Sequence, residues 1–337
     1  GLGTLSAVST ILNGPGGGFA VESAPVTGLV RTWASNDLVT GSAASASAMA
    51  TGVKTRKKTI SKNEDGSDNR TLFEAAAARG LSTGVVTTSG LADATPAAFV
   101  SHSPYRYEFR SILEQMLQSD ADVLIGGDYT NHSKAKKQAD YMAMVHHVES
   151  AQSNGKTIVR NGEELWAASG PVVALFPPRP GFAYAHGPPL ADTAGYALDV
   201  LNRNPSGFFL LLECEETDEG AHANDLNRVV AGMAELDLAT RRVLEFASEN
   251  GETLVIVTAD HDTGGVAILD GSFDDATATV GWVSDNHIGS WVPLFAFGPG
   301  AAQFSGVMDN TDIGLRIADL LGLEDFPSIA TAPWPPS

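Results

Sequence analysis

The chain has 337 residues, of which 43% are hydrophobic and 18% charged, so it can bury a sizeable core and is not disordered throughout. This length fits two domains or one large α/β domain. The formal charge of −19 argues against general binding to nucleic acid or anionic lipid, because both favour a basic protein surface. We therefore expect no specific nucleic-acid partner and no membrane partner.

Two further features bound the class of protein. No apolar run approaches the roughly 18 residues of a membrane span, and Cys214 is the single cysteine, which excludes an intrachain disulfide. The sequence starts at Gly1 without methionine and shows no signal peptide. We expect either a removed leader or a fragment.

Short apolar runs alternate with helical patterns along the chain, as is typical of α/β proteins. The runs that begin near residues 83, 208 and 253 are apolar on both faces, which predicts central strands covered by helices on both sides. The expected strands are residues 28–33, 83–88, 122–126, 171–176, 208–212, 253–258 and 294–297. The expected helices are residues 4–12, 43–51, 72–79, 109–117, 134–148, 193–201, 226–248 and 313–320.

Polar side chains follow three of the predicted strands where each strand ends. Ligands of open α/β sheets bind beyond the carboxyl ends of the strands, so we expect these side chains to share one crevice. They are Asp93 and Thr95 after the first of these strands, Glu213, Asp218 and His222 after the second, and Asp260 and His261 after the third.

The spacing of Asp218 and His222 is that of an i, i+4 pair, which can share one metal ion on a helix. A solvated acidic loop is an equal alternative, because Glu215, Glu216 and Glu219 are also acidic. Mixed sets of Asp, Glu and His without thiolates favour zinc where histidine is present and magnesium where all donors are oxygen.

Asp260 and His261 come directly before paired glycines, which suits two cation ligands backed by tight backbone. A plain strand-ending turn is the alternative, because Asp and Gly are common turn residues. His287 precedes the strand that ends at residue 297, and a lone histidine is more often a surface or core residue than a ligand.

Ser42 stands at the first turn of an alanine-rich helix, where it is either a plain N-cap or a nucleophile. A helix N-terminus favours an anion, whether alkoxide or phosphate. No Gly-x-Ser-x-Gly elbow surrounds Ser42, so the sequence does not support the triad of the α/β-hydrolases. A bound metal is another way to activate a serine.

Thr95 precedes Pro96, which predicts an extended residue with its hydroxyl free for a hard cation. Arg106 offers a planar fork that matches two phosphoryl oxygens, although a solvated arginine is the simpler interpretation. The basic stretch 54–58 is interpreted as a solvated hairpin, with substrate steering as a less favoured alternative.

Together these motifs resemble the alkaline phosphatase family, and in family order they cover almost the whole chain. The matching sequences are TGSAASASA with TGVK around Ser42, DATPAA with Arg106, the Glu213, Asp218 and His222 set, TADHDTGG, and His287. The resemblance implies a three-layer αβα sandwich with a central, mostly parallel sheet, formed by one catalytic domain over residues 1–337. It also implies hydrolysis of small phosphate monoesters through a phosphoserine at Ser42, releasing inorganic phosphate and an alcohol.

The same resemblance implies two Zn²⁺ and one Mg²⁺ per chain. The first Zn²⁺ would be held by Asp218, His222 and His287, the second by Asp260 and His261 with Ser42 as its reactive ligand, and Mg²⁺ by Glu213 and Thr95. Arg106 would clamp the phosphoryl group, and Asp93 would orient Arg106 or water bound to magnesium. The family also implies a periplasmic or extracellular location and allows a homodimer.

The sequence departs from the family pattern in four places. The first family strand ends in a Gly-Asp-Gly motif whose aspartate bridges the second zinc and magnesium, and Gly1 resembles the residue after that aspartate, so we expect that strand and ligand to be missing. Gly41 replaces an aspartate that many members carry before the nucleophile. Glu219 replaces a lysine of some members, which should weaken phosphate binding. The stretch between His261 and His287 lacks a large insertion.

Three alternatives remain open from the sequence. A phosphodiesterase or a sulfatase could use the same scaffold, although Ser42 lacks the sulfatase motif Cys/Ser-x-Pro-x-Arg. A protein that binds zinc or phosphate without catalysis is the third, because the bridging aspartate is absent.

Overall fold

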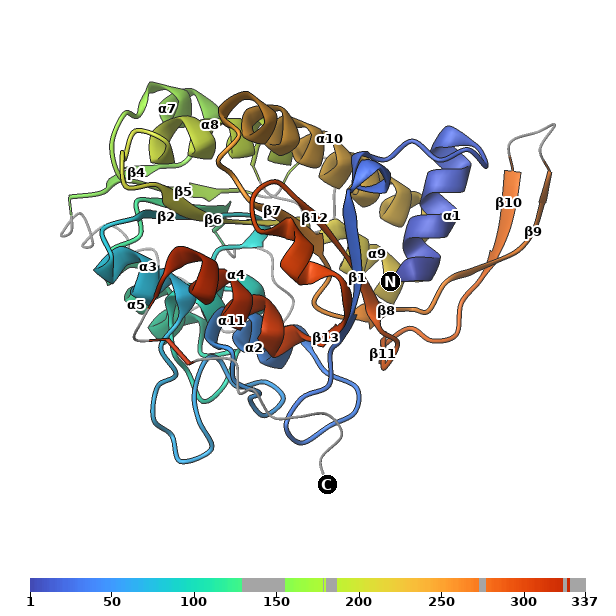
Figure 1. Ribbon diagram of the computed structural model, residues 1–337, viewed down its shortest axis with the longest axis horizontal. Helices are drawn as coiled ribbons and strands as arrows, with labels where there is room; N and C mark the ends of the chain where they lie inside the picture. The colour runs from blue at the N-terminus through green and yellow to red at the C-terminus, as the bar shows by residue number, and fades with distance from the viewer. Residues whose placement is uncertain (129–154, 178, 180–186, 273–276, 324–325, 328–337) are drawn as a thin grey trace.

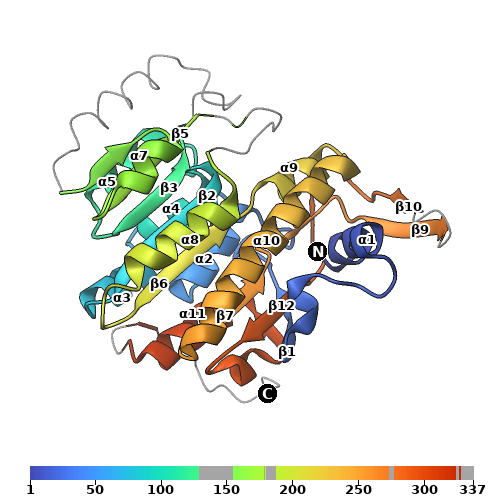
Figure 2. The same ribbon diagram turned by 90° about the horizontal axis from the view of Figure 1, so that it is seen from above.

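Five parallel strands form a sheet in the order β4-β5-β3-β2-β6 in the computed structural model, which describes residues 1–128, 155–177, 179, 187–272, 277–323 and 326–327. The helices α8 and α10 cover one face, and α3 and α4 cover the other (Figures 1 and 2). This arrangement confirms the predicted αβα sandwich. The bounds are β2 (Ser82–Gly90), β3 (Val123–Gly127), β4 (Thr157–Val159), β5 (Val172–Phe176), β6 (Phe208–Glu213), α3 (Leu72–Ala78), α4 (Ala94–Val100), α8 (Leu190–Leu201) and α10 (Leu226–Asn250).

A second sheet of four strands has the order β13-β1-β12-β7. Strand β12 runs antiparallel to both β1 and β7, whereas β1 and β13 are parallel, so this part of the structure is mixed. The bounds are β1 (Val26–Arg31), β7 (Val255–Thr258), β12 (Val292–Phe297) and β13 (Gly306–Asp309).

A slot separates the two sheets. Within the described residues β6 pairs only with β2, and β7 pairs only with β12, so both are edge strands and not the central strands that their sequences predict. A cavity of about 830 Å³ lies between them, lined by Leu210, Leu212 and Ile256 among other apolar side chains. Every residue of β6 is only half-buried, whereas β2 is almost entirely buried.

The helix α2 (Ser42–Thr51) lies beneath this slot and is buried from Ala43 onwards. It ends at Gly52, which has the left-handed φ of 71° that glycine adopts without strain. The helix α11 (Asn310–Leu321) packs closely on α2, because a Cβ on Gly314 would lie 2.2 Å from the carbonyl oxygen of Met49. This contact holds α2 directly against α11.

The predicted elements are present with shifted ends, except that the expected helix at 134–148 lies outside the described residues. The sequence did not predict the short helices α4, α7 (Gly162–Ala167) and α9 (Glu216–His222) or the short strands β4 and β13. It also did not predict the hairpin of β9 (Ala267–Ser272) and β10 (Thr277–Gly281), which projects from the body (Figure 1). The remaining elements are α1 (Leu2–Asn13), α5 (Phe109–Gln118), β8 (Asp262–Thr263), β11 (His287–Ile288) and the 3-10 turns Ala20–Ser23 and Ala301–Phe304. In the part of the chain that is described, no helix combines the length and apolarity of a membrane span.

Candidate active site

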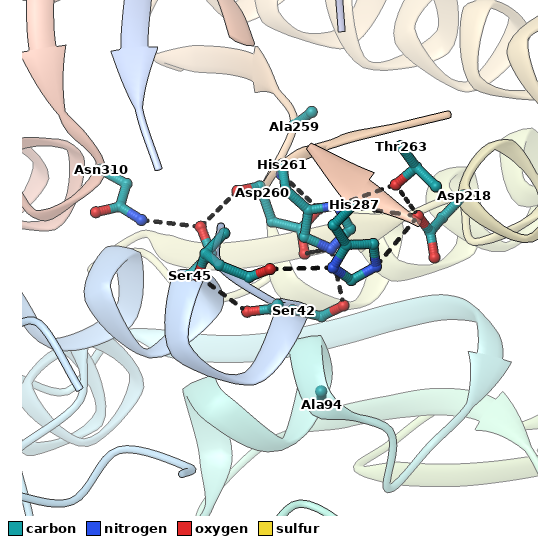
Figure 3. Close-up of polar contacts among 12 residues, drawn as sticks. Ser42, Ser45, Ala94, Asp218, Ala259, Asp260, His261, Thr263, His287 and Asn310 are labelled. Atoms are coloured by element: carbon teal, nitrogen blue, oxygen red, sulfur yellow. Dashed lines mark hydrogen bonds and ion pairs between the residues drawn. The ribbon is translucent and has the colours of Figure 1, made fainter. Parts of the chain in front are cut away.

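Ser42 is the first residue of α2, and its N-cap is Gly41, so Ser42 is not the cap itself. Its Oγ lies 3.1 Å from Nε2 of His261 (Figure 3). The hydroxyl therefore sits at the positive end of a ten-residue helix with an imidazole within hydrogen-bond reach.

Asp260 and His261 follow β7 and turn toward Ser42. His261 is 5% exposed, and its Nε2 is also 3.1 Å from Oδ2 of Asp260. Burial opposes ionisation of Asp260, but the charge of His261 and its hydrogen bond outweigh burial and lower the pKa of Asp260 to about 2. The pair thus presents a carboxylate and an imidazole nitrogen to the serine hydroxyl. This arrangement suits a cation site, whereas a plain strand-ending turn would not need it.

Asp218, His222 and His287 form a second cluster beside the first. Asp218 and His222 are one turn apart on α9, with Oδ2 of Asp218 3.4 Å from Nε2 of His222. One donor atom from each of the three residues lies within 4.8 Å of the others. The alternative of a solvated acidic loop is wrong, because these acids lie on a helix in which Glu216 is buried and paired with Arg228.

The hydrogen bonds of the two histidines indicate what this cluster can bind. Nδ1 of His222 lies 2.7 Å from the carbonyl oxygen of Asp285, and Nδ1 of His287 lies 3.1 Å from that of Thr40. Because a carbonyl oxygen only accepts, each Nδ1 carries a hydrogen, and Nε2 is then the ring atom that can offer a lone pair to a cation.

The two Nε2 atoms are 3.0 Å apart and both lie near Asp218. Two facing lone pairs repel, and a cation between them would remove this conflict. Burial and the charge of His261 lower the pKa of His287 to about 4, which favours the neutral, ligating form. Two imidazoles and a carboxylate are a donor set that fits zinc.

Glu213, at the end of β6, lies in an oxygen-rich cluster. Thr87 donates a hydrogen bond of 2.6 Å to Glu213, and Thr95 is a further hydrogen-bond partner. Burial raises the pKa of Glu213 to about 7 against these hydrogen bonds. The prediction that Thr95 is extended is wrong: it lies in the first turn of α4, where Pro96 needs no N–H and Asp93 caps the helix.

Arg106 faces this region and is not a solvated arginine, since its side chain is 16% exposed. Its Nη2 donates to Oδ1 of Asp93 over 2.6 Å, and Asp93 also accepts from Ser89 over 2.9 Å. The Nε of Arg106 is buried without a hydrogen-bond partner. The charge of Arg106 also acts on His261, which places the guanidinium near the serine site.

Three further residues belong to this surrounding. The Thr263 hydroxyl donates to Asp218 and lies 3.2 Å from Nδ1 of His261, so it links the two cation clusters. Burial and the neighbouring charges of Glu213 and Asp93 raise the pKa of Glu215. Burial and Asp218 do the same for Glu219. Glu215 could not be assigned a role from the sequence, because acidic residues are common in a chain of this charge.

Two adjoining clusters of carboxylate and imidazole donors lie beside a serine hydroxyl, with an arginine facing them, which is an arrangement suited to a metal-dependent hydrolase. The comparisons give the family. A family model described as alkaline phosphatase matches residues 12–272. The chain is 31% identical to the alkaline phosphatase of Escherichia coli K12, over 95% of this chain and 83% of that protein. It is 30% identical to the streptomycin-6-phosphate phosphatase of Streptomyces griseus, over 92% and 85%.

Solved structures agree with this result. The alkaline phosphatase of the Antarctic bacterium TAB5 superimposes with a TM-score of 0.81 at 29% identity, covering 96% of this chain and 95% of that one. A variant of the same enzyme is described with magnesium bound in its third metal site. The chain therefore belongs to the alkaline phosphatase family and is a phosphate monoester hydrolase.

Proposed function

We propose that this chain hydrolyses small phosphate monoesters through a phosphoserine at Ser42. The carrying observation is the 3.1 Å contact of the Ser42 hydroxyl with His261, beside the carboxylate of Asp260. In this mechanism the Ser42 oxygen attacks phosphorus in line and the alcohol leaves. Water then cleaves the phosphoserine and releases inorganic phosphate.

Two Zn²⁺ and one Mg²⁺ are proposed as the bound cations. Asp218, His222 and His287 would hold one Zn²⁺, Asp260 and His261 the other, and Glu213 with Thr95 the Mg²⁺. Bound there, the cations would supply Lewis-acid stabilisation of the serine alkoxide and of the leaving oxygen. The Nε2 lone pairs of His222 and His287 and the raised pKa of Glu213 support this assignment.

Arg106 is proposed to bind two oxygens of the phosphoryl group, with Asp93 holding its guanidinium in place. The hydrogen bond between these two side chains supports the positioning role, and the unpartnered Nε leaves a donor for substrate. Glu219 would add negative charge near the phosphate and thereby favour product release.

A single catalytic domain over residues 1–337 is proposed. The slot between β6 and β7 has room for one additional strand. Among the described residues, no strand pairs with the edges of β6 and β7 that face the slot, and such edges are normally covered or paired. Strand β6 ends in the site at Glu213, and β7 ends at Thr258, two residues before Asp260, so a strand running alongside them would carry its last residue there. Gly1 and Ser42 also line this cavity. The slot supports the expected aspartate-bearing strand as its occupant.

The location is proposed to be periplasmic or extracellular, and a homodimer is proposed as the assembly. The bacterial relatives and the single cysteine are compatible with these proposals. Sedimentation velocity tests the assembly, and a single species at the mass of one chain would exclude the dimer.

Steady-state rates on a phosphate monoester, a diester and a sulfate ester test the function. The chain should be compared with a version extended ahead of Gly1 by an apolar strand that ends in Asp-Gly, both supplied with Zn²⁺ and Mg²⁺. We expect the extended chain to prefer the monoester by a large factor. The matched control carries Asn for the added Asp. Absence of turnover in every version would instead favour a binding protein without catalysis.

A further inference from the structure

The side chain of the lysine that follows α2, Lys54, is largely withdrawn from solvent, which corrects its interpretation as part of a solvated hairpin. The side chain of Lys54 is 13% exposed, and burial lowers its pKa against the opposing charge of Asp309. Its Nζ lies 2.8 Å from the carbonyl oxygen of Trp33, 2.8 Å from Oδ1 of Asp309 and 2.6 Å from Oδ1 of Asn310. The ammonium therefore donates hydrogen bonds to Trp33 and Asn310 and forms an ion pair with Asp309.

Lys54 fixes the orientation of the Asn310 amide. Because the ammonium only donates, the amide oxygen must face Lys54 and the amide nitrogen must face the other way. There Nδ2 of Asn310 donates to Oγ of Ser45 over 2.8 Å. Asn310 is 1% exposed and Ser45 is 0% exposed, so water does not compete for this hydrogen bond.

Ser45 continues the same donor-to-acceptor order toward Asp260. Its Oγ accepts from Asn310 and donates its single hydrogen to the carbonyl oxygen of Asp260, 2.6 Å away (Figure 3). The result is a one-way chain of donors from Lys54 through Asn310 and Ser45 to the backbone of Asp260. Charge at its start strengthens such a chain in a buried setting.

This row of hydrogen bonds joins parts of the fold that are distant in sequence. Ser45 lies one turn after Ser42 on α2, and Asn310 begins α11. Asp260 follows β7 and precedes His261, which contacts Ser42. The hydrogen bonds therefore set the distance between the helix that carries the nucleophile and the backbone that carries the second pair of cation ligands.

We propose that Lys54, Asn310 and Ser45 are positioning residues that fix Asp260 and His261 relative to Ser42. This inference rests on the proposed function, in which those ligands and Ser42 share one reaction centre. Breaking these hydrogen bonds should loosen the spacing between Ser42 and Asp260 without removing any ligand. Small displacements in a reaction centre reduce rates strongly.

Ser45→Ala is the main test, and Ser47→Ala is its matched control. Ser47 is equally buried on α2, donates to the carbonyl oxygen of Thr59 and accepts from the N–H of Ser61, away from the site. We expect Ser45→Ala to lower kcat about tenfold to a hundredfold with little change in KM, and to weaken zinc binding about tenfold in competition with a chelator. Ser47→Ala should change thermal stability only. Equal kcat and zinc affinity in the two variants would overturn the proposal.

Asn310→Asp tests the direction of the chain in a side chain of the same shape. A carboxylate at this position would still pair with Lys54 but would accept the Ser45 hydrogen, which turns the hydroxyl away from Asp260. We expect an effect like that of Ser45→Ala and no additional effect in the double variant. Additive effects would contradict a single chain. Zinc affinity does not depend on formation of a phosphoserine. This readout therefore tests the positioning hydrogen bonds separately from the proposed reaction.

Discussion

The Oγ of Ser42 lies 3.1 Å from Nε2 of His261, although the two residues are 219 positions apart in the sequence. The same nitrogen faces Asp260, and the ring of His261 stacks on that of His287 with centroids 3.6 Å apart. Ser42 is therefore in direct contact with one proposed set of cation ligands, Asp260 and His261, and the proposed set that includes His287 lies beyond the ring of His261.

Ser42→Ala should abolish the rapid release of alcohol that accompanies formation of a phosphoenzyme. We expect kcat to fall at least about 10³-fold, because no other hydroxyl replaces the nucleophile. Zinc content should stay near normal, since aspartate and histidine side chains supply the remaining ligands. Metal analysis and burst kinetics measure both effects, and a loss of zinc would count against a role restricted to nucleophilic attack.

His222→Ala should lower zinc occupancy, because it removes one of three donors in the cluster with Asp218 and His287. His102→Ala is the control, since His102 is bonded to Glu74 and the backbone of Ser61 outside the site. Metal analysis after dialysis separates the two variants. Unchanged zinc in His222→Ala would remove His222 from the ligand set.

Arg106→Lys should raise KM and lower kcat/KM about tenfold to a hundredfold, because an ammonium cannot bind two phosphoryl oxygens as a planar fork does. Arg179→Lys is a suitable control. Arg179 is also largely buried and paired with a carboxylate, that of Glu235, but away from the site. A similar change in kcat/KM for both variants would indicate a general effect on folding.

The metal-free protein should lose stability as the pH rises from about 4.5 to about 7. In this window Glu213 is already ionised in the unfolded chain but still protonated in the fold, where its pKa is about 7. The loss reaches about 3 kcal/mol for this group. Glu213→Gln should flatten the dependence.

Denaturant unfolding with a chelator at pH 5 and pH 7.5 measures this difference. His261, Glu215 and Glu219 also have raised pKa values, so their contributions to stability decline with rising pH as well. The comparison of the two proteins measures the contribution of Glu213 together with its effect on Glu215. An identical pH slope in Glu213→Gln would show that Glu213 titrates normally.

The sequence predicted the αβα layers and the gathering of acids and histidines at one end of the sheet, because strand patterns and polar residues at strand ends are local signals. It did not predict the burial of Lys54, since a lysine in a basic run has no local sign of the partners Trp33 and Asn310. The helical conformation of Thr95 was missed because a residue before proline disfavours it, whereas here Asp93 caps the helix that contains Thr95. The edge position of β6 depends on pairing alone, which its apolar sequence does not reveal.

The most direct test of the account is the identity of the residue that carries phosphate during turnover. The extended chain, loaded with Zn²⁺ and Mg²⁺, is mixed with a phosphate monoester, quenched in acid and digested for tandem mass spectrometry. We predict phosphate on Ser42 alone, forming as fast as the alcohol is released and absent from Ser42→Ala. Hydrolysis at the full rate with no phosphate on Ser42, or with phosphate on another residue, would contradict the account.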